Sequence, residues 1–437
     1  MKTQIFSLKN GAKVLFNKQT DVRGITVELN FTAGAINDKK GKLGIAHFCE
    51  HAIFGFPNAK MSREERASYK RKFHYFNAYT NFSMVVFIIQ MTEEDFEDAI
   101  DFLTEPFLSI KLNQEEFEKE KKIIEDEIKT RVQRNSAQYG IIERTEIIKD
   151  EQFKNLITSP AGMVETLNNI TLEDIKEFIS EYLTLNNLCV SISGNISKNR
   201  VKKAMHKYVE ARIGTSSKQG LLTRDINELY TPKYHFDNAA EEGKALLSCV
   251  YTLKHIPWTY EVHRDWLVSA VLSMVLREYA YLYYRQKKNL CYSCSLEIIS
   301  IANHLTNEFY IECQEENLQE VIECYNEFLN QLPENIGPEM FEKHKRKMLL
   351  SYNFDFLGIT KVADAMFSVY FRENKLFNTK YIKEVLKDKK SVTYDEVNAM
   401  YKTIFSVKPH ITIISNDEKY KDFDYKSFAK VAQLKRS

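Results

Sequence analysis

The chain has 437 residues, 44% of them hydrophobic, which is enough for two domains with separate cores. Its 61 Lys and Arg residues nearly balance 60 Asp and Glu residues, so the net charge of +1 gives no argument for binding nucleic acid or an anionic membrane surface. The sequence shows no run of about eighteen apolar residues and no apolar signal region near its start, so we expect a soluble, cytoplasmic protein.

Predicted strands and helices alternate along the first part of the chain. Turn residues and alternating hydrophobic residues indicate two or three strands within residues 1–37. Residues 44–55 lie between two glycines, contain no proline and fit a helix of about three turns. A Ser-x-x-Glu pattern at residues 62–65 indicates the start of another helix, and residues 83–91 are strongly β-prone. The next helix is expected to begin at the cap residue Thr92.

The predicted helix 44–55 carries His47, Glu50 and His51 in an H-x-x-E-H pattern. The two histidines are four residues apart, so both imidazoles leave one face of the helix and can bind one metal ion. Glu50 lies beside this face and can reach a water at the metal without being a ligand. Alone, the pattern also fits an exposed polar helix turn, so a third ligand on another element must decide between the two interpretations.

A helix predicted at residues 117–128 offers that third ligand. Glu120 and Glu127 are seven residues apart and share one face beside an apolar stripe, whereas Glu118 and Glu125 fall on the solvent side with the lysines. A helix rich in Glu and Lys is usually a solvated surface helix. The assignment of a ligand to this helix therefore depends on the histidine motif.

An internal repeat indicates two similar halves. Residues 171–178 precede a predicted strand and recur as residues 393–400, which also precede a strand. A second match, Phe-Glu-Lys at residues 117–119 and 341–343, has nearly the same offset. The two halves would join around residues 214–220. No H-x-x-E-H pattern precedes the second copy, so we expect one metal site per chain.

The combination of H-x-x-E-H with the second Glu of an E-x6-E helix resembles the pitrilysin/insulinase family of inverted zinc peptidases. This family includes the mitochondrial processing peptidase and its two-domain bacterial relatives. The resemblance implies that His47, His51 and Glu127 bind one zinc ion and that Glu50 is the general base. It also implies that Glu120 supports the ligands from behind. Cys49, Ala52 and residues 55–58 depart from the usual family pattern, but none of them is a ligand.

Further segments extend the resemblance to both halves. Residues 77–80 match the family's N-A-x-T segment, and Arg285 with Tyr292 matches its R-x6-Y segment, in which Asn289 replaces a glycine. Arg285 would pair with a substrate carbonyl or carboxylate and Tyr292 would donate to the developing oxyanion, although packing alone would also explain both. Asn77 would bond the main chain of a peptide lying along an edge strand, or it would simply close a turn.

The family architecture implies an α+β fold of two duplicated domains, each an antiparallel β-sheet with helices on one side. We place an N-terminal catalytic zinc domain at residues 1–213, a linker at 214–238 and a homologous C-terminal domain at 239–437. The C-terminal domain would lack a zinc site and supply substrate-binding residues.

Seven scattered cysteines suit a reducing compartment. Cys291 and Cys294 form a C-x-x-C pattern, which in principle indicates a metal or redox site. In a regular strand, however, residues three apart point to opposite faces. The sequence also has no second C-x-x-C to complete a zinc site. We therefore expect these cysteines to be structural.

The resemblance implies a zinc-dependent endopeptidase that hydrolyses small peptides or leader segments and works as a homodimer or with a related chain. Glu50 would take the proton of the attacking water and return it to the leaving amine. Two alternatives stay open: a partner-dependent subunit of a heterodimeric peptide-maturation protease, and a catalytically silent scaffold. Scaffold members lose the motif, whereas His47, Glu50, His51 and Glu127 are all present here.

Overall fold

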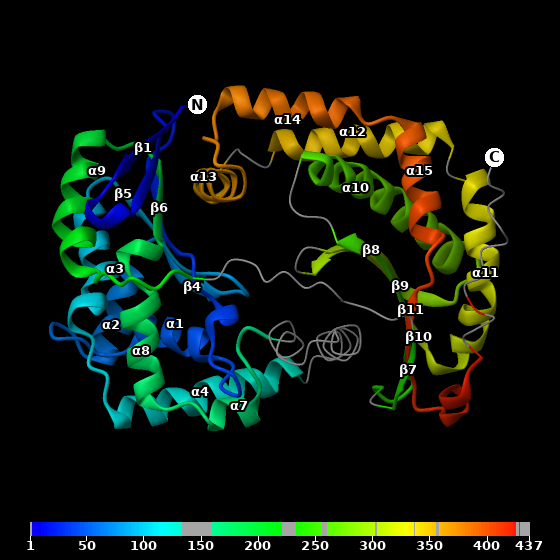
Figure 1. Cartoon of the computed structure of the whole chain (residues 1–437), viewed down its shortest axis with the longest axis horizontal. Helices are drawn as coiled ribbons and strands as arrows, with labels where there is room; N and C mark the ends of the chain where they lie inside the picture. The colour runs from blue at the N-terminus through cyan, green and yellow to red at the C-terminus, as the bar shows by residue number, and fades with distance from the viewer. Residues whose placement is uncertain are drawn as a thin grey trace. The chain divides into compact units, whose positions relative to one another are not determined.

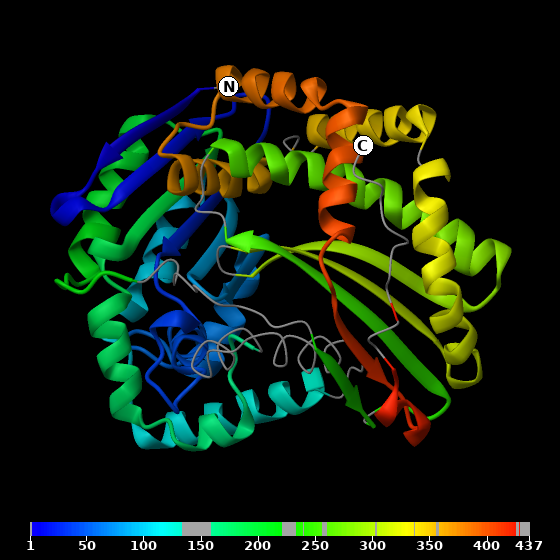
Figure 2. The same ribbon diagram turned by 45° about the vertical axis from the view of Figure 1, so that its right-hand side comes forward.

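A computed structural model of the chain shows two compact α+β units (Figures 1 and 2). It describes residues 2–132, 159–220, 233–238, 240–255, 260–301, 304–335, 337–354, 358–424 and 428. The first unit comprises the described residues up to 132, residues 159–220 and the described residues of 353–384. The second unit comprises the described residues of 224–352 and of 385–437. The predicted α+β fold with two units is confirmed.

The first unit contains a six-stranded mixed sheet. In spatial order its strands are β1 (Thr3–Ser7), β2 (Lys13–Lys18), β6 (Leu188–Gly194), β3 (Gly24–Phe31), β5 (Val85–Thr92) and β4 (Tyr75–Thr80). The expectation of an antiparallel sheet is wrong at one position, because β2 and β6 are parallel. The strand β6 inserts between β2 and β3, which run in opposite directions, and so it must be parallel to one of them.

Helices cover both faces of this sheet (Figure 1). On one face, the side chains of Val27, Leu29 and Phe31 enter a core shared with the helices of residues 45–204. On the other face, α13 (Ile359–Glu373) packs against β6, β3 and β2. The expectation of helices on one side therefore holds for the helices of the N-terminal half alone. Residues 359–373, which were expected in the C-terminal domain, lie in the first unit, and the sequence does not reveal this packing.

The helices of the first core follow the predicted order. They are α1 (Ile45–Gly55), α2 (Arg63–Tyr69), α3 (Phe96–Ser109), α4 (Gln114–Val132), α7 (Val164–Asn168), α8 (Leu172–Tyr182) and α9 (Lys198–Ala204). The helix α3 begins after Asp95 rather than after Thr92, because β5 continues through Thr92. Short helical turns complete the unit: η1 (Lys9–Gly11), η2 (Ala35–Asn37), η3 (Lys70–Lys72), η4 (Leu185–Asn187) and η5 (Met205–Glu210).

The second unit contains a five-stranded mixed sheet. Its strands in spatial order are β7 (Tyr234–Asp237), β11 (His410–Ile414), β8 (Lys244–His255), β10 (His304–Gln314) and β9 (Cys291–Ile301). Its helices and turns are α10 (Tyr260–Ala280), η6 (Tyr281–Lys287), η7 (Glu315–Asn317), α11 (Leu318–Asn335), α12 (Pro338–Phe354), α15 (Tyr394–Phe405) and η8 (Glu418–Asp422). The remaining helix, α14 (Thr379–Ser391), contains one boundary between the two units, and another falls near the end of α12, after Tyr352.

The predicted internal repeat is visible in equivalent elements of the two units. Thr171 caps α8 and Thr393 caps α15, each accepting a hydrogen bond from a backbone N–H three residues later. Each helix leads to an inserted strand, β6 or β11, which is parallel to one neighbour and antiparallel to the other. Phe117 on α4 and Phe341 on α12 are both buried. The repeat therefore corresponds to a repeated structure. No helix among the described residues is long and apolar enough to cross a membrane.

Candidate metal centre

The helix α1, which carries the H-x-x-E-H motif, is fixed at its N-terminus by a buried carboxylate. Gly44 caps the helix with a left-handed backbone (φ 101°), and a Cβ atom there would lie 2.5 Å from the carbonyl oxygen of Ala161. Asp38 accepts the backbone N–H groups of Gly44 (2.7 Å) and Ala46 (2.8 Å). Burial raises the pKa of Asp38 to about 8, so these hydrogen bonds, rather than a full negative charge, hold the start of the helix. Asp38 therefore sets where the helix begins, at Ile45, two residues before His47.

The C-terminus of α1 is held by a buried guanidinium. Arg66 on α2 is 2% exposed and donates to the carbonyl oxygens of Ile53 (3.0 Å) and Phe54 (3.2 Å). Burial lowers the pKa of Arg66 to about 10, so the group still carries its charge at neutral pH. A cation is favourable at this end of a helix. The helix is thus anchored at both ends by hydrogen bonds with buried polar side chains, Asp38 and Arg66, which the sequence pattern does not reveal.

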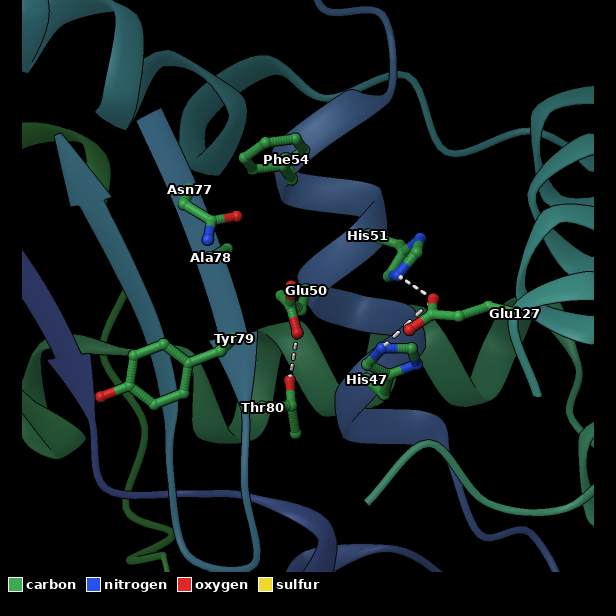
Figure 3. Close-up of a pocket in the computed structure, with 9 residues that line it drawn as sticks. All are labelled: His47, Glu50, His51, Phe54, Asn77, Ala78, Tyr79, Thr80 and Glu127. Carbon is green, nitrogen blue, oxygen red and sulfur yellow. Dashed lines mark hydrogen bonds and ion pairs between the residues drawn. The ribbon is translucent and has the colours of Figure 1, made fainter. Parts of the chain in front are cut away.

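Three potential ligands converge where α1 faces α4 (Figure 3). The Nε2 atoms of His47 and His51 lie 3.8 Å and 3.4 Å from Oε2 of Glu127. Ligands about 2.0–2.1 Å from a tetrahedral zinc ion lie roughly 3.3 Å from one another. The distances therefore fit one zinc ion after a small closure. Within the described part of the chain, these are the one set of three or more His, Cys, Asp or Glu residues whose ligand atoms all lie within 4.8 Å of one another.

Glu120 contacts the candidate ligand His51, in the position that the resemblance implies for a supporting carboxylate. It is 4% exposed, and its Oε1 atom accepts a hydrogen bond from Nδ1 of His51 at 2.8 Å. Its Oε2 atom accepts from Nη1 of Arg63 at 2.6 Å, and Arg63 also donates to Glu116. Burial by itself raises the pKa of Glu120, but these two donors outweigh it and lower the pKa below the usual value. With Nδ1 bonded to a carboxylate, His51 presents Nε2 to the metal.

The same contacts shift the pKa of His51. Burial alone would lower the pKa of His51, but hydrogen bonds to Glu120 and Glu127 raise it to about 9.

Arg63 was not identified from the sequence. It lies 57 residues from Glu120, and its position at the start of a capped helix gives no signal of this contact.

We expect Glu120→Gln to weaken zinc binding by about 10–100-fold, because it removes the negative charge that orients and polarises His51. The measurement is a competitive zinc titration against a chromophoric chelator. The matched control is Glu118→Gln, because Glu118 is exposed on the same helix, and it should bind zinc like the native chain. Equal zinc affinities in the two variants would show that Glu120 does not support the site.

Glu50 faces the same cavity from α1. It is 7% exposed, and Oγ1 of Thr80 on β4 donates a hydrogen bond to its Oε2 atom at 2.7 Å (Figure 3). The cavity has a volume of about 360 Å³. It is lined by His47, Glu50, His51, Phe54, Asn77, Ala78, Tyr79, Thr80 and Glu127. The candidate base and the candidate ligands therefore share one open space, and Thr80 fixes the orientation of the base.

We expect Thr80→Val to lower kcat roughly 10-fold, since a hydrogen bond to a charged group is worth about 1.5–3 kcal/mol. Valine keeps the shape of threonine but cannot donate to Glu50. Zinc content should not change, and KM should change less than kcat. Thr80→Ser restores the donor and should recover most of the lost turnover. A serine variant as slow as the valine variant would mean that the hydroxyl does not act through Glu50.

Asn77 lies within β4, opposite Ile88 of β5, so the alternative that it closes a turn is wrong. The strand β4 is at the edge of the sheet, as expected, and pairs with β5. The side-chain amide of Asn77 donates to the Tyr75 hydroxyl at 2.8 Å and borders the cavity. Its contact with a substrate main chain stays a prediction.

Arg285 and Tyr292 belong to the second unit, on η6 and β9. Nη1 of Arg285 donates to the carbonyl oxygen of Tyr292 (3.0 Å), and the guanidinium lies 4.7 Å from the centre of its ring. Tyr292 is 82% exposed, so this ring does not pack into the core of its unit. Asn289, which replaces the family's glycine, has φ 55°, so asparagine does adopt the left-handed conformation here. The roles of Arg285 and Tyr292 toward substrate stay predictions.

Comparison with known proteins places the chain in a family. Residues 13–151 match the family model described as Insulinase (Peptidase family M16), and residues 169–348 match the model described as Peptidase M16 inactive domain. The uncharacterized zinc protease YmxG of Bacillus subtilis is 23% identical over 94% of this chain and 97% of its own length. The zinc protease PqqE of Helicobacter pylori is 24% identical over 63% of this chain, and the match spans 61% of that protein.

Further matches agree. Mitochondrial-processing peptidase subunit beta of Dictyostelium discoideum is 23% identical over 59% of this chain and 54% of its own length. A crystal structure of a protease from Helicobacter pylori has the same fold, with a TM-score of 0.77 at 18% identity over 94% of this chain and 98% of that one. A peptidase M16 inactive domain from Pseudomonas fluorescens gives a TM-score of 0.78 at 14% identity over 95% and 98%. Because the two family models together match most of the sequence, the chain belongs to the insulinase family of peptidases, family M16.

Proposed function

We propose that the chain is a zinc-dependent endopeptidase that hydrolyses small peptides or leader segments. The observation that carries this proposal is the convergence of two imidazoles and one carboxylate beside a second carboxylate, Glu50, in one cavity. Relatives that are named zinc proteases support the same class of reaction. Bound at this position by His47, His51 and Glu127, one zinc ion would lower the pKa of a water and polarise a peptide carbonyl.

The residues of the chain would divide the proton transfer and the positioning between them. Glu50 accepts the proton of the attacking water and then delivers it to the nitrogen of the leaving amine. Thr80 holds the Glu50 carboxylate toward the cavity by its hydrogen bond. Glu120 and Arg63 hold His51 in the orientation that presents Nε2 to the metal. Neither Thr80 nor Arg63 reacts; both are positioning residues.

The substrate would bind as an extended strand along β4. This edge strand borders the cavity through Asn77, Ala78 and Thr80, so a peptide that pairs with it would pass Glu50. Asn77 would bond a main-chain group of the peptide. Pairing of this kind reads the main chain more than the side chains, so we expect a broad range of short peptides to be accepted. From the second unit, Arg285 would pair with a substrate carbonyl or carboxylate, and Tyr292 would donate to the oxyanion.

We expect a cytoplasmic homodimer or a heterodimer with a related chain. A relative that is named as the beta subunit of a mitochondrial processing peptidase favours a partner-dependent protease as the second candidate. A silent scaffold is the third, and the intact set of His47, Glu50, His51 and Glu127 argues against it.

The test uses the purified chain and a mixture of short peptides of unrelated sequence. We expect cleavage of internal peptide bonds, loss of cleavage after treatment with a chelator, and recovery when zinc is returned. Cleavage that requires a second chain would replace the self-sufficient enzyme with the heterodimer. A chain that binds zinc but cleaves nothing, alone or with a related chain, would contradict the proposed function.

A further inference from the structure

A β-bulge in the second unit brings the C-x-x-C cysteines to one face of the sheet. In the pairing of β9 with β10, Cys294 lies opposite Ile311, whereas Cys291 lies opposite Cys313. Between these two pairs β9 advances by three residues and β10 by two, so β9 has one additional residue there. A bulge of this kind changes the side on which the following residue points. The assumption of a regular strand, from which we expected opposite faces, is wrong here.

The burial of these residues agrees with the register. Ile311 and Cys313, two residues apart on β10, are 0% and 4% exposed and belong to the core of the second unit. Residues directly opposite one another point to the same face. Cys291 is accordingly 9% exposed in that core, and Cys294 is partly buried against it. Tyr292, between them, is turned outward.

The two thiols are in contact and differ in their acidity. The Cys294 thiol donates a hydrogen bond to Cys291, which lowers the pKa of the Cys291 thiol, and the charge of Arg285 lowers it further. The same hydrogen bond raises the pKa of Cys294. Burial raises the pKa of the neighbouring Cys313 to about 12, so that thiol stays protonated. Of the two thiols, Cys291 is therefore the more readily deprotonated and the expected attacking group, with Cys294 beside it as a partner.

We propose that Cys291 and Cys294 form a redox-active dithiol that hydrogen peroxide converts into an intramolecular disulfide. Two protein thiols and one hydrogen peroxide give one disulfide and two water molecules. The Cys291 thiolate attacks one peroxide oxygen, so that an S–O bond forms, the O–O bond breaks and the first water leaves after protonation. The sulfur of Cys294 then attacks the sulfur of Cys291, so that the S–S bond forms and the S–O bond breaks. The departing hydroxide takes the Cys294 proton as the second water.

The location of this dithiol connects it to the predicted substrate-binding residues. The disulfide would link the two residues that flank Tyr292 and Ser293, and so would tighten the bulge. The carbonyl oxygen and the ring of Tyr292 are the groups that Arg285 contacts. Oxidation would therefore displace the side chains of Arg285 and Tyr292. This consequence for catalysis, unlike the formation of the disulfide itself, rests on the proposed function.

The sequence around the dithiol permits a direct measurement. Cleavage after Lys288 and Glu297 gives the peptide 289–297, which contains Cys291 and Cys294 and no other cysteine. The native, full-length chain is treated with a small excess of hydrogen peroxide, quenched with catalase, unfolded in N-ethylmaleimide and digested. By mass spectrometry we expect most of this peptide to carry no maleimide label. Its mass should be lower than that of the reduced peptide by two hydrogen atoms, which the disulfide has lost. Peptides that contain the buried Cys49 or Cys189 should stay labelled. Two maleimide labels on peptide 289–297, or a disulfide that joins Cys291 to Cys313, would overturn the proposal.

Two single variants test the assigned roles. In Cys294→Ser the partner is missing, so peroxide should leave a sulfenic acid on Cys291 that dimedone captures. In Cys291→Ser we expect no dimedone adduct on Cys294. As a control, Cys189→Ser should form the disulfide like the native chain. An adduct on Cys294 but none on Cys291 would contradict the assignment of the attacking thiol.

The effect on catalysis is measured separately. Peroxide should reduce peptide turnover by the native chain, and a phosphine reductant should restore it, whereas Cys291→Ser should be insensitive to this treatment. Disulfide formation without any change in turnover would remove the proposed effect on Arg285 and Tyr292 and keep the dithiol. If the native chain cleaves no peptide, the mass measurement still tests the dithiol, so the two failures are distinguishable.

Discussion

Glu50→Gln is expected to reduce kcat by about 10²–10⁴-fold while the chain keeps its full zinc content. Glutamine matches glutamate in size and can still accept the hydrogen bond from Thr80, so the cavity should keep its shape. What it loses is the ability to take a proton from water. Zinc content is measured by atomic emission and turnover by peptide cleavage, both on the same preparation.

The zinc content of Glu50→Gln shows whether Glu50 acts as the general base or as a zinc ligand. If Glu50→Gln lost its zinc, Glu50 would belong to the ligand set and the assignment of Glu127 would need revision. If it kept both zinc and turnover, the base would have to be another group of the cavity. The native chain after chelation and zinc return serves as the control for losses during handling.

Glu127→Gln is expected to have the second large effect, on zinc itself. The Oε2 atom of Glu127 lies 3.8 Å and 3.4 Å from the Nε2 atoms of His47 and His51, and Glu127 is the one carboxylate among the three ligand residues. An amide is a much weaker ligand than a carboxylate for this ion. Zinc affinity should therefore fall by more than the roughly 100-fold upper value for an outer partner such as Glu120, and turnover should disappear with the metal.

The helix α4 supplies a matched control two residues away. Glu125 is partly exposed and forms an ion pair with Lys129 at 2.6 Å, so Glu125→Gln removes the same charge from the same helix. This variant should bind zinc and cleave peptides like the native chain. If both variants lost zinc equally, the net charge of the helix rather than a specific ligand would explain the effect.

Local periodicity explains why much of the site was visible in the sequence. The spacing of four residues between His47 and His51 needs only one helix turn to be correct, and the spacing of seven places Glu120 and Glu127 on one face of α4. The structure agrees, since Glu120 is buried while Glu118 is exposed. The capped helix start at Ser62 was also predicted, because capping uses residues three apart.

Contacts between distant segments explain what was missed. Arg63 meets Glu120 across 57 residues and Thr80 meets Glu50 across 30, and no spacing pattern along the chain encodes either contact. Thr80 lies in the N-A-x-T segment, so the resemblance marked its position without giving its role. Asp38 and Arg66 likewise act on backbone groups of α1, which leave no mark in the side-chain pattern.

Strand geometry limited two other expectations. A single additional residue at Tyr292 reversed the expected orientation of Cys291 relative to Cys294, and bulges have no reliable sequence pattern. The parallel pairing of β2 with β6 depends on where a strand 170 residues later inserts, which local propensities do not determine.

X-ray absorption at the zinc edge, on the native chain loaded with one zinc ion, tests the proposed metal centre most directly. With His47, His51 and Glu127 as ligands, the nearest shell should contain only nitrogen and oxygen, at about 2.0–2.2 Å, with the outer scattering of two imidazole rings. A sulfur shell near 2.3 Å would place the zinc on cysteines instead, and would contradict the centre on which the proposed peptidase depends.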